Sequence, residues 1–141
     1  MEINTQTIET KKVGNSNAKS FFSPRGLQSI TLFVGSTIDA IVINGVRLGG
    51  DGGSQIQKDD KDYTFFFKEN EYIVRLAIQH GDGIDNIDFT TNFGHSFSGG
   101  GKGGHTLTTF IGEIIAFGGQ YGDRLDVLTV AGNTSVTVQK V

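Results

Sequence analysis

The stretch GDRLDVLTV, residues 122–130, repeats a pattern that occurs twice earlier in the chain, as GSTIDAIVI at residues 35–43 and GDGIDNIDF at residues 81–89. Each copy has a glycine, three varied residues and an aspartate, followed by apolar residues two and four positions after the aspartate. The copies begin at residues 35, 81 and 122, so they are 46 and 41 residues apart. A repeat of this length predicts that one unit of structure occurs three times in the chain.

The composition favours a single all-β domain. The chain has 141 residues, which is long enough to bury a substantial core, and it contains 21 glycines but only one proline. Glycines concentrated between β-branched and aromatic segments indicate many tight turns between strands. The net charge of −3 comes from well-mixed charges, which argues against nucleic acid and anionic membranes as partners.

The chain has no cysteine, so it has neither a disulfide framework nor a thiolate metal site. No stretch is apolar enough to span a bilayer, and the polar start MEINTQTIETKKV lacks the apolar region of a signal peptide. We therefore expect a soluble chain with no signal peptide and no membrane insertion. Its cellular location stays open.

Eight short apolar or alternating segments predict strands, and no window has a convincing helical period. They are SITLFV (29–34), AIVI (40–43), YTFFF (63–67), YIVRLAI (72–78), NIDFTT (86–91), EIIAFG (113–118), DVLTV (126–130) and SVTVQ (135–139).

Glycine clusters alternate with the aspartate motifs along the chain: GGDGG at residues 49–53, GGKGG at 100–104, and GNSNA at 14–18 in the place of a third. The alternation predicts three units of about four short strands each, which suits a closed prism of three sheets with few free edges. The repeat covers about residues 13–130. Residues 1–12 and 131–141 lie outside it, and the alternating Val136 and Val138 indicate an added edge strand.

The repeated aspartates and glycines are compatible with a purely structural role, because both residue types form turns. A recurring pair of glycine loop and aspartate also suits a binding site. Glycines let the backbone approach a ligand closely, and a carboxylate accepts hydrogen bonds on two oxygens. A neutral, hydroxyl-rich ligand such as a sugar fits this combination, whereas the aspartate would repel a phosphate.

The segments GSTIDAIVINGVRLGGDGG and NEYIVRLAIQHGDGIDNIDFTTNFG, followed by GGKGG and GDRLDVLTV, resemble the jacalin-related lectins. The resemblance runs from about Val13 to Val130 and is most similar to mannose-binding members with three sugar sites. It implies a β-prism I fold of three Greek-key four-stranded sheets with pseudo-threefold symmetry. It also implies mannose-type binding at one end of the prism, with neither enzymatic activity nor a cofactor.

In such lectins the aspartate carboxylate binds two sugar hydroxyls, and backbone amides of the adjacent loops assist. Carried over, the resemblance pairs Asp39 with Gly53, Asp85 with Gly104, and Asp126 with the N-terminal loop at Ala18. The remaining candidate site residues lie in the same loops: Gly35, Thr37, Ile38, Gly52, Gly81, Gly83, Ile84, Gly103, Gly122, Arg124, Leu125 and Asn17.

The sequence departs from the three-site members in two ways. Those members have a tyrosine two residues before each aspartate, where this chain has Thr37, Gly83 and Arg124. The third glycine loop is GNSNA, in which Ala18 carries a side chain that disfavours a left-handed backbone. Galactose-type members need a glycine N-terminus made by cleavage, which nothing here indicates, so mannose or glucose is the predicted sugar.

Other chemistries are less well supported. HGDGIDNID at residues 80–88 looks like one turn of a calcium-binding β-roll, but that fold needs tandem copies every nine residues. EF-hand spacing is absent. His80, His95 and His105 lack metal spacing and are interpreted as solvated polar residues, so no metal is expected. Glu69 and Glu71 could form a glycosidase pair, but they lie in a polar turn with nothing to raise either pKa.

The leading hypothesis is therefore a multivalent lectin whose partners are mannose-type or glucose-type glycans and the glycoproteins that carry them. A β-prism module that binds protein with little sugar affinity is the alternative, and a glycosidase is third. Three-site members exchange their first strands between protomers. Here the linker SFFSPRGLQ (20–28) is longer, which favours an unswapped monomer over a dimer.

Overall fold

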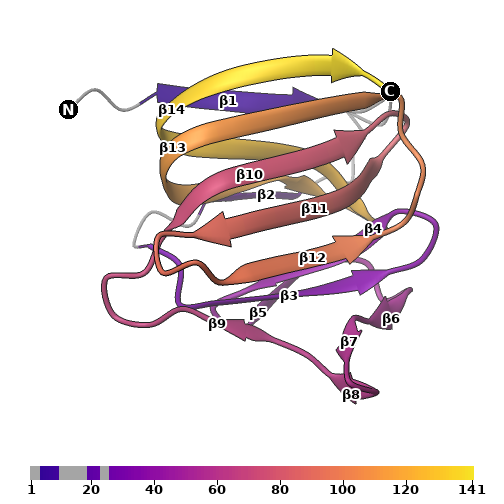
Figure 1. The fold of residues 1–141 in the computed structure, drawn as a ribbon. Coiled ribbons are helices and arrows are strands. Elements are labelled where there is room, and N and C mark those ends of the chain that lie inside the picture. The colour runs from indigo at the N-terminus through magenta and orange to yellow at the C-terminus, as the bar shows by residue number, and fades with distance from the viewer. Residues whose placement is uncertain (1–3, 10–18, 23–25) are drawn as a thin grey trace.

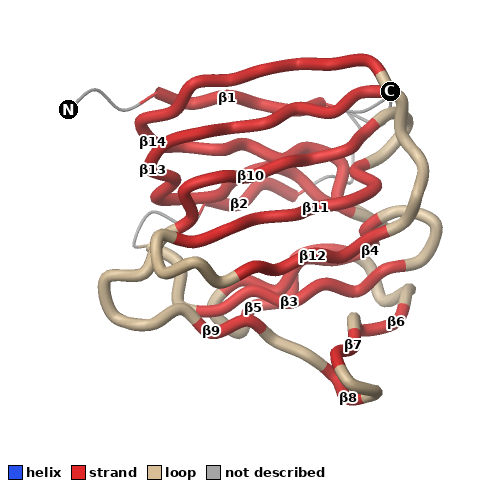
Figure 2. The backbone as a smooth tube through the Cα atoms, viewed as in Figure 1, coloured by secondary structure: helices blue, strands red, loops and turns tan. Residues whose placement is uncertain are grey.

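A computed structural model describes residues 4–9, 19–22 and 26–141. The described residues form strands, turns and loops without any helix, which confirms the predicted all-β class (Figure 2). Within them, no helix is present that could span a membrane. Residues 10–18, which include the third glycine cluster with Asn17 and Ala18, lie outside the described residues.

The first repeat forms a sheet with strand order β5-β4-β3-β6, and β9 also pairs with β3. Beside it, β7 and β8 form a two-stranded hairpin (Figure 1). The strands of this part are β3 (Ser29–Val34), β4 (Ile38–Ile43), β5 (Val46–Gly49), β6 (Ser54–Gln55), β7 (Gln57–Lys58), β8 (Lys61–Asp62) and β9 (Phe65–Phe66).

The second and third repeats share one sheet with the order β1-β14-β13-β10-β11-β12, with β2 also paired to β13. They share it because β13 and β14 are 16 residues long and run through both repeats. The strands are β1 (Asn4–Glu9), β2 (Lys19–Phe22), β10 (Ile73–His80), β11 (Ile84–Thr91), β12 (Ser96–Gly100), β13 (Thr106–Tyr121) and β14 (Leu125–Lys140).

The long strand β13 changes partners along its length, while β14 pairs with it throughout. The first part of β13, Thr106 to Ile114, pairs with β10, whereas Gly118 to Tyr121 pair with β2. Just before the change, the backbones of β13 and β14 come very close: a Cβ at Gly112 would lie 2.1 Å from the Asn133 carbonyl oxygen. Glycine therefore allows the strand pair to bend from one side of the prism to the next.

The terminal segments are part of the sheet. β1 pairs with β14 from Asn4↔Gly132 to Glu9↔Val127, so residues that the sequence analysis placed outside the repeat add a strand to it. The end of β14 pairs with β13, which confirms the edge strand predicted from Val136 and Val138. The predicted strand EIIAFG is only the middle of β13, because the threonine-rich start of that strand has a weak apolar pattern.

The core is built from the inward faces of these strands. Alternate residues of β11 are buried, and Phe89 is fully enclosed. The Phe89 ring centroid lies 4.9 Å from that of Phe97 and 5.2 Å from that of Phe65. These contacts join the first sheet to the second, since Phe65 belongs to β9 and the other two rings to β11 and β12.

Candidate functional site

The three aspartate motifs fold into the same tight loop. In each, the backbone N–H of the first glycine donates to the carbonyl two residues later, and the strand register shifts just before the loop. The three bonds are Gly35 N to Thr37 O at 2.9 Å, Gly81 N to Gly83 O at 2.9 Å, and Gly122 N to Arg124 O at 3.0 Å. The repeat in the sequence is thus a repeat of backbone geometry.

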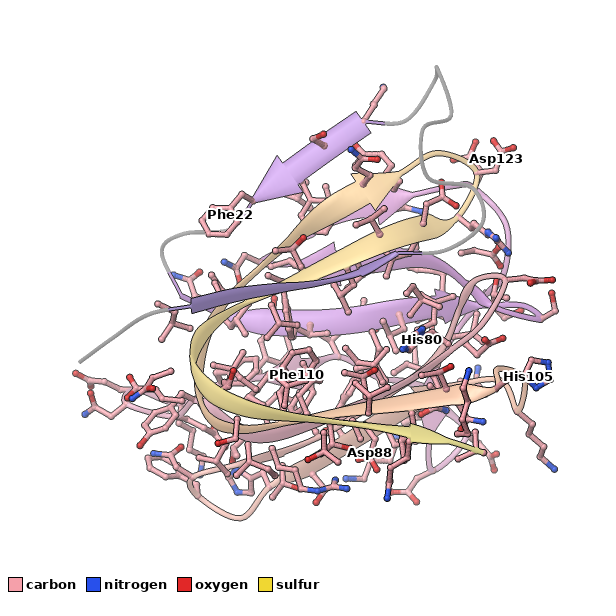
Figure 3. All side chains as sticks on the ribbon, turned by 90° about the horizontal axis from the view of Figure 1, so that it is seen from above. Phe22, His80, Asp88, His105, Phe110 and Asp123 are labelled. Carbon is pink, nitrogen blue, oxygen red and sulfur yellow. The ribbon has the colours of Figure 1, made fainter. Side chains whose placement is uncertain are left out.

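The three loops lie at one end of the molecule. They connect β3 to β4, β10 to β11 and β13 to β14, whose ends meet on the right in Figure 1. Figure 3 shows His80, His105 and Asp123 on this same side, with Phe110 in the interior. The resemblance predicted one shared binding end, and the loops are arranged accordingly.

The first glycine loop packs directly on Asp39. Gly53 has a φ of +76°, and a Cβ there would lie 2.6 Å from Asp39 Oδ2. The Gly50 N–H donates to the Asp39 carbonyl at 3.0 Å, and a Cβ at Gly52 would be 3.7 Å from Asp39 Cγ. The predicted pair Asp39 and Gly53 is therefore brought together, and a side chain at Gly53 would collide with the carboxylate.

The second loop has the same construction around Asp85. Gly104 has a φ of +94°, and a Cβ there would lie 2.7 Å from Asp85 Oδ2. A Cβ at Gly103 would be 2.7 Å from Oδ1 of the same carboxylate. The Gly101 N–H donates to the Asp85 carbonyl at 2.8 Å. Both intact glycine loops thus meet their predicted aspartates in the same way.

The third site differs. Arg124 Nε donates to Asp126 Oδ1 at 3.3 Å, and the side chain of Asp126 is only 2% exposed. The same guanidinium also donates to the Asp82 carbonyl in the neighbouring motif loop. The guanidinium packs directly on Gly83, since a Cβ at Gly83 would lie 2.7 Å from Arg124 Nη1. Arg124 therefore binds its own aspartate and crosses to the second site.

The glycine loops also contact the next motif loop around the prism end. A Cβ at Gly50 would lie 2.0 Å from the Asp123 carbonyl oxygen, and one at Gly101 would lie 2.8 Å from that of Ser36. Asp123 and Ser36 both follow the first glycine of their motif. Each described glycine loop is therefore held between its own aspartate and a neighbouring repeat.

The three carboxylates differ in exposure. Asp39 is half-buried, whereas Asp85 is 5% and Asp126 is 1% exposed. Burial raises the pKa of Asp85, Arg124 lowers it, Asp82 raises it further, and His105 lowers it, for a net increase. Of these carboxylates, that of Asp39 is the most accessible to a ligand.

The apolar residues just before the aspartates serve the core. The side chains of Ile38, Ile84 and Leu125 are fully buried. Only their backbone groups can reach a ligand, which agrees with the assisting role that the family resemblance gives to loop amides.

Two polar side chains that the sequence analysis did not single out reach the glycine loops. Arg47 donates to the carbonyls of Gly50 and Gly52, and Gln79 Nε2 donates to the Gly104 carbonyl at 3.2 Å. The motif spacing does not reveal them, because neither belongs to a motif: Arg47 lies three residues before Gly50, and Gln79 lies 25 residues before Gly104.

The sequence analysis placed Glu71 in a polar turn, but its carboxylate is buried, whereas His95 is exposed as interpreted and His80 is half-buried. Glu71 is 7% exposed and accepts hydrogen bonds from Thr91 Oγ1 at 2.6 Å, from the Lys68 N–H at 2.8 Å, and from His95 Nδ1 at 2.6 Å. His80 Nε2 is 2.9 Å from Thr108 Oγ1. These partners cannot be recognised from the local sequence, because Thr91 is 20 residues from Glu71.

The Glu71 cluster does not belong to the candidate sugar sites. Thr91 ends β11, whereas Asp85 lies near its start, so the cluster and the aspartate are at opposite ends of that strand. Burial raises the pKa of Glu71, but the hydrogen bonds from Lys68, Thr91 and His95 outweigh it and lower the pKa overall. Across the described residues, no group of three or more histidine, aspartate or glutamate side chains could hold a metal ion.

Comparison with known proteins places this geometry in context. Residues 4–131 match the jacalin-like lectin domain family. Griffithsin from Griffithsia sp. (strain Q66D336) is 40% identical over 125 residues, which cover 88% of this chain and 96% of griffithsin.

Two solved structures share the fold. The Malaysian banana lectin has a TM-score of 0.72 at 22% identity, covering 95% of this chain and 100% of the lectin. A mannose-binding jacalin-related lectin from Ananas comosus has a TM-score of 0.66 at 18% identity, covering 92% and 96%. At these identities the likeness concerns the fold alone.

Proposed function

Because the chain belongs to the jacalin-like lectin family, as its motifs predicted, we propose that it is a multivalent lectin for mannose-type or glucose-type glycans. The family binds carbohydrate and is not enzymatic, which agrees with the prediction that this chain is no enzyme. The proposal treats residues 1–141 as one lectin domain and high-mannose glycoproteins as its partners.

The observation that carries the proposal is the repeated contact between a glycine loop and an aspartate. Gly53 and Gly104 both have a positive φ and both lie against a carboxylate. Backbone N–H groups beside a fixed carboxylate offer donors and acceptors together, and vicinal sugar hydroxyls need both. The proposed ligand-binding groups are the carboxylates of Asp39 and Asp85 with the amides of their loops.

The acidic character of this end supports a neutral sugar. Asp82 and Asp123 lie in the motif loops next to the binding aspartates, and Asp51 lies in the first glycine loop. With the binding aspartates they outnumber the basic residues of these loops, Lys102 and Arg124. A sulfated or sialylated glycan would meet this negative potential unfavourably.

Calorimetry with mannose and methyl mannoside tests the proposal directly. A single shallow sugar site is expected to bind at around millimolar concentration, or about −4 kcal/mol. Binding that persists in EDTA would support the carboxylate–amide mechanism, whereas loss in EDTA would contradict it. The absence of any binding at millimolar sugar would refute the lectin proposal.

The second candidate is a module that binds protein and has little sugar affinity. The observation that favours it is the ion pair between Arg124 and Asp126, which takes up the carboxylate that a sugar would need. Arg124 stands at the position where the family resemblance implies a tyrosine. A pull-down would favour this candidate if it captured a protein partner that competing mannose does not release.

We also propose that the chain is an unswapped monomer. The support is the longer linker SFFSPRGLQ, residues 20–28, which gives the N-terminal strand room to fold back onto its own chain. Light scattering at micromolar concentration is expected to give the mass of one chain. A stable dimer as the only species would contradict this.

A further inference from the structure

The first glycine loop, residues 49–53, is held in place by one arginine. We propose that Arg47 is a positioning residue of the Asp39 site, and that its guanidinium keeps Gly52 and Gly53 against the Asp39 carboxylate. The inference rests on the proposed function, because it deepens the account of the same site.

The contacts of Arg47 are specific to the loop backbone. Its Nε donates to the Gly50 carbonyl at 2.9 Å, and its Nη2 donates to the same oxygen at 2.6 Å. Nη2 also lies 3.2 Å from the Gly52 carbonyl oxygen. One planar guanidinium thus joins two carbonyls on either side of Asp51, an arrangement that the point-like ammonium of lysine cannot reproduce.

The guanidinium is itself oriented by an aromatic ring. Arg47 Cζ lies 3.9 Å from the centroid of the Phe33 ring, which is within the range of a cation–π interaction. Phe33 lies on β3 and Arg47 on β5, so the stack spans the sheet across β4. The Phe33 ring therefore orients the guanidinium, although the Arg47 side chain is exposed.

The loop needs such support because its own sequence is flexible. Four of its five residues are glycine, and Asp51 to Gly53 are exposed to solvent. Glycine loses the most conformational freedom on ordering. A ligand that binds an unsupported loop must overcome this entropy, whereas a loop already held by Arg47 is ready to bind.

The second glycine loop, residues 100–104, is supported by other side chains. Gln79 occupies the position of Phe33, since each pairs with the residue that follows the motif aspartate. It donates to the Gly104 carbonyl at 3.2 Å, and Asn86 Nδ2 lies 3.4 Å from the Gly101 carbonyl oxygen. The two sites are therefore supported independently, and each provides a control for the other.

The experiment uses full-length chains that retain a single described site. Asp85→Ala with Asp126→Ala leaves the Asp39 site, and Asp39→Ala with Asp126→Ala leaves the Asp85 site. Arg47→Ala, Arg47→Lys and Gln79→Ala are added to each, and mannose binding is measured by calorimetry. Arg75→Ala, at an exposed arginine on β10, is the matched control.

Arg47→Ala is expected to weaken mannose binding at the Asp39 site by about fivefold to tenfold, as for hydrogen bonds to a charged group partly screened by water. It should leave the Asp85 site unchanged. Gln79→Ala should weaken only the Asp85 site, Arg47→Lys should give a smaller loss than Arg47→Ala, and Arg75→Ala should weaken neither.

A second measurement needs no sugar. Amide hydrogen exchange by NMR in the sugar-free protein should be about tenfold faster in Arg47→Ala at Gly50, whose N–H donates to the Asp39 carbonyl. It should be unchanged at Gly101, whose N–H donates to the Asp85 carbonyl. A purely global loss of stability would instead accelerate exchange in both loops and weaken both sites.

The outcomes separate the two proposals. Unchanged loop exchange, or equal weakening of both sites, would overturn the positioning role of Arg47 even if mannose binds well. Failure of the parent chain to bind any sugar would overturn the proposed function and with it the role of Arg47 in binding. The exchange measurement would then show whether the arginine orders the loop at all.

Discussion

Asp85 shows at the scale of one residue how a binding group can reduce stability. Its folded-state pKa lies above the ordinary value, chiefly because of burial. A carboxyl with a raised pKa favours the folded state while protonated, so this stabilisation is present below the ordinary pKa and is lost as pH rises through the raised pKa. At neutral pH the ionised Asp85 therefore lowers the free energy of unfolding.

Asp85→Asn is expected to raise the melting temperature at pH 7 while removing sugar binding at the second site, because an amide cannot replace the carboxylate acceptors. Thermal unfolding at pH 7 and at a pH below the ordinary aspartate pKa measures the first effect, and calorimetry measures the second. The stabilisation should disappear at the lower pH. A melting temperature that falls at pH 7 would contradict this account.

The pKa of Glu71 is shifted in the opposite direction to that of Asp85. Its folded-state pKa is lowered, so its contribution to stability is present above the ordinary glutamate pKa and is lost as pH falls through the lowered value. Glu71→Gln should destabilise the fold by roughly 1.5–3 kcal/mol at neutral pH, since the charged hydrogen bonds to Thr91 and His95 are lost. Denaturant unfolding from pH 7 down to pH 3 should show the difference shrinking. Mannose binding should stay unchanged, because Glu71 lies at the other end of the prism.

The three aspartates should differ in their importance for binding. Asp39→Ala and Asp85→Ala each remove a carboxylate that faces a glycine loop, worth roughly 1.5–3 kcal/mol of charged hydrogen bonding. Asp126→Ala should have the smallest effect, because that carboxylate already accepts from Arg124 and its side chain is 2% exposed. Calorimetry on the three variants checks the order. If Asp126→Ala proves the most damaging, Arg124 must contribute to the ligand site rather than close it.

At the scale of elements, the sequence predicts the motif loops well and the long strands poorly. The aspartate loops are recognisable because glycine, aspartate and the following alternation recur in one register. β12 and the first half of β13 were missed, since their sequences SFSGG and TLTTFIG are rich in small and polar residues. Their place in the sheet depends on pairing with β11 and β10, which no local pattern encodes.

The same limit applies to the site. The pairs of aspartate and glycine loop follow from the family resemblance, and the structure brings two of them together. The crossing of Arg124 to the second motif loop joins residues 42 positions apart in the chain. Such a contact depends on how three repeats close around an axis, so spacing within one motif cannot reveal it.

Two glycines of one loop provide a matched test of the contact between repeats. A Cβ at Gly50 would lie 2.0 Å from the Asp123 carbonyl oxygen, whereas the nearest atom to a Cβ at Gly52 is 3.7 Å away. Neither glycine has a positive φ, so an alanine at either position causes no left-handed backbone strain and the two variants differ only in steric contact. Gly50→Ala should destabilise the fold by about 1–3 kcal/mol through overpacking, and Gly52→Ala should leave it nearly unchanged. Denaturant unfolding of both variants measures the difference in stability. Equal stability of the two variants would contradict the close contact between the first glycine loop and the third motif loop.

At the scale of the whole molecule, three motif loops lie at one end, and their side-chain surroundings differ. The motif loops share one backbone geometry, but the first glycine loop is supported by Arg47, the second by Gln79, and the third aspartate is bound by Arg124. The three sites therefore differ in the side chains around them more than in the backbone of their motif loops. The expected result is a multivalent binding end whose sites differ in strength.

This arrangement predicts weak binding of monosaccharide and much tighter binding of branched glycans. Asp39 and Asp85 lie at the same end of the prism, so one branched high-mannose glycan can engage both if its arms span them. Linking two weak events in this way gains about 10²–10⁴ in affinity when the spacing allows. Calorimetry should show that the high-mannose glycan loses this gain in Asp39→Ala, while the affinity of the remaining site for mannose is unchanged. Equal affinity of the native chain for mannose and for the branched glycan would show that the two sites do not act together.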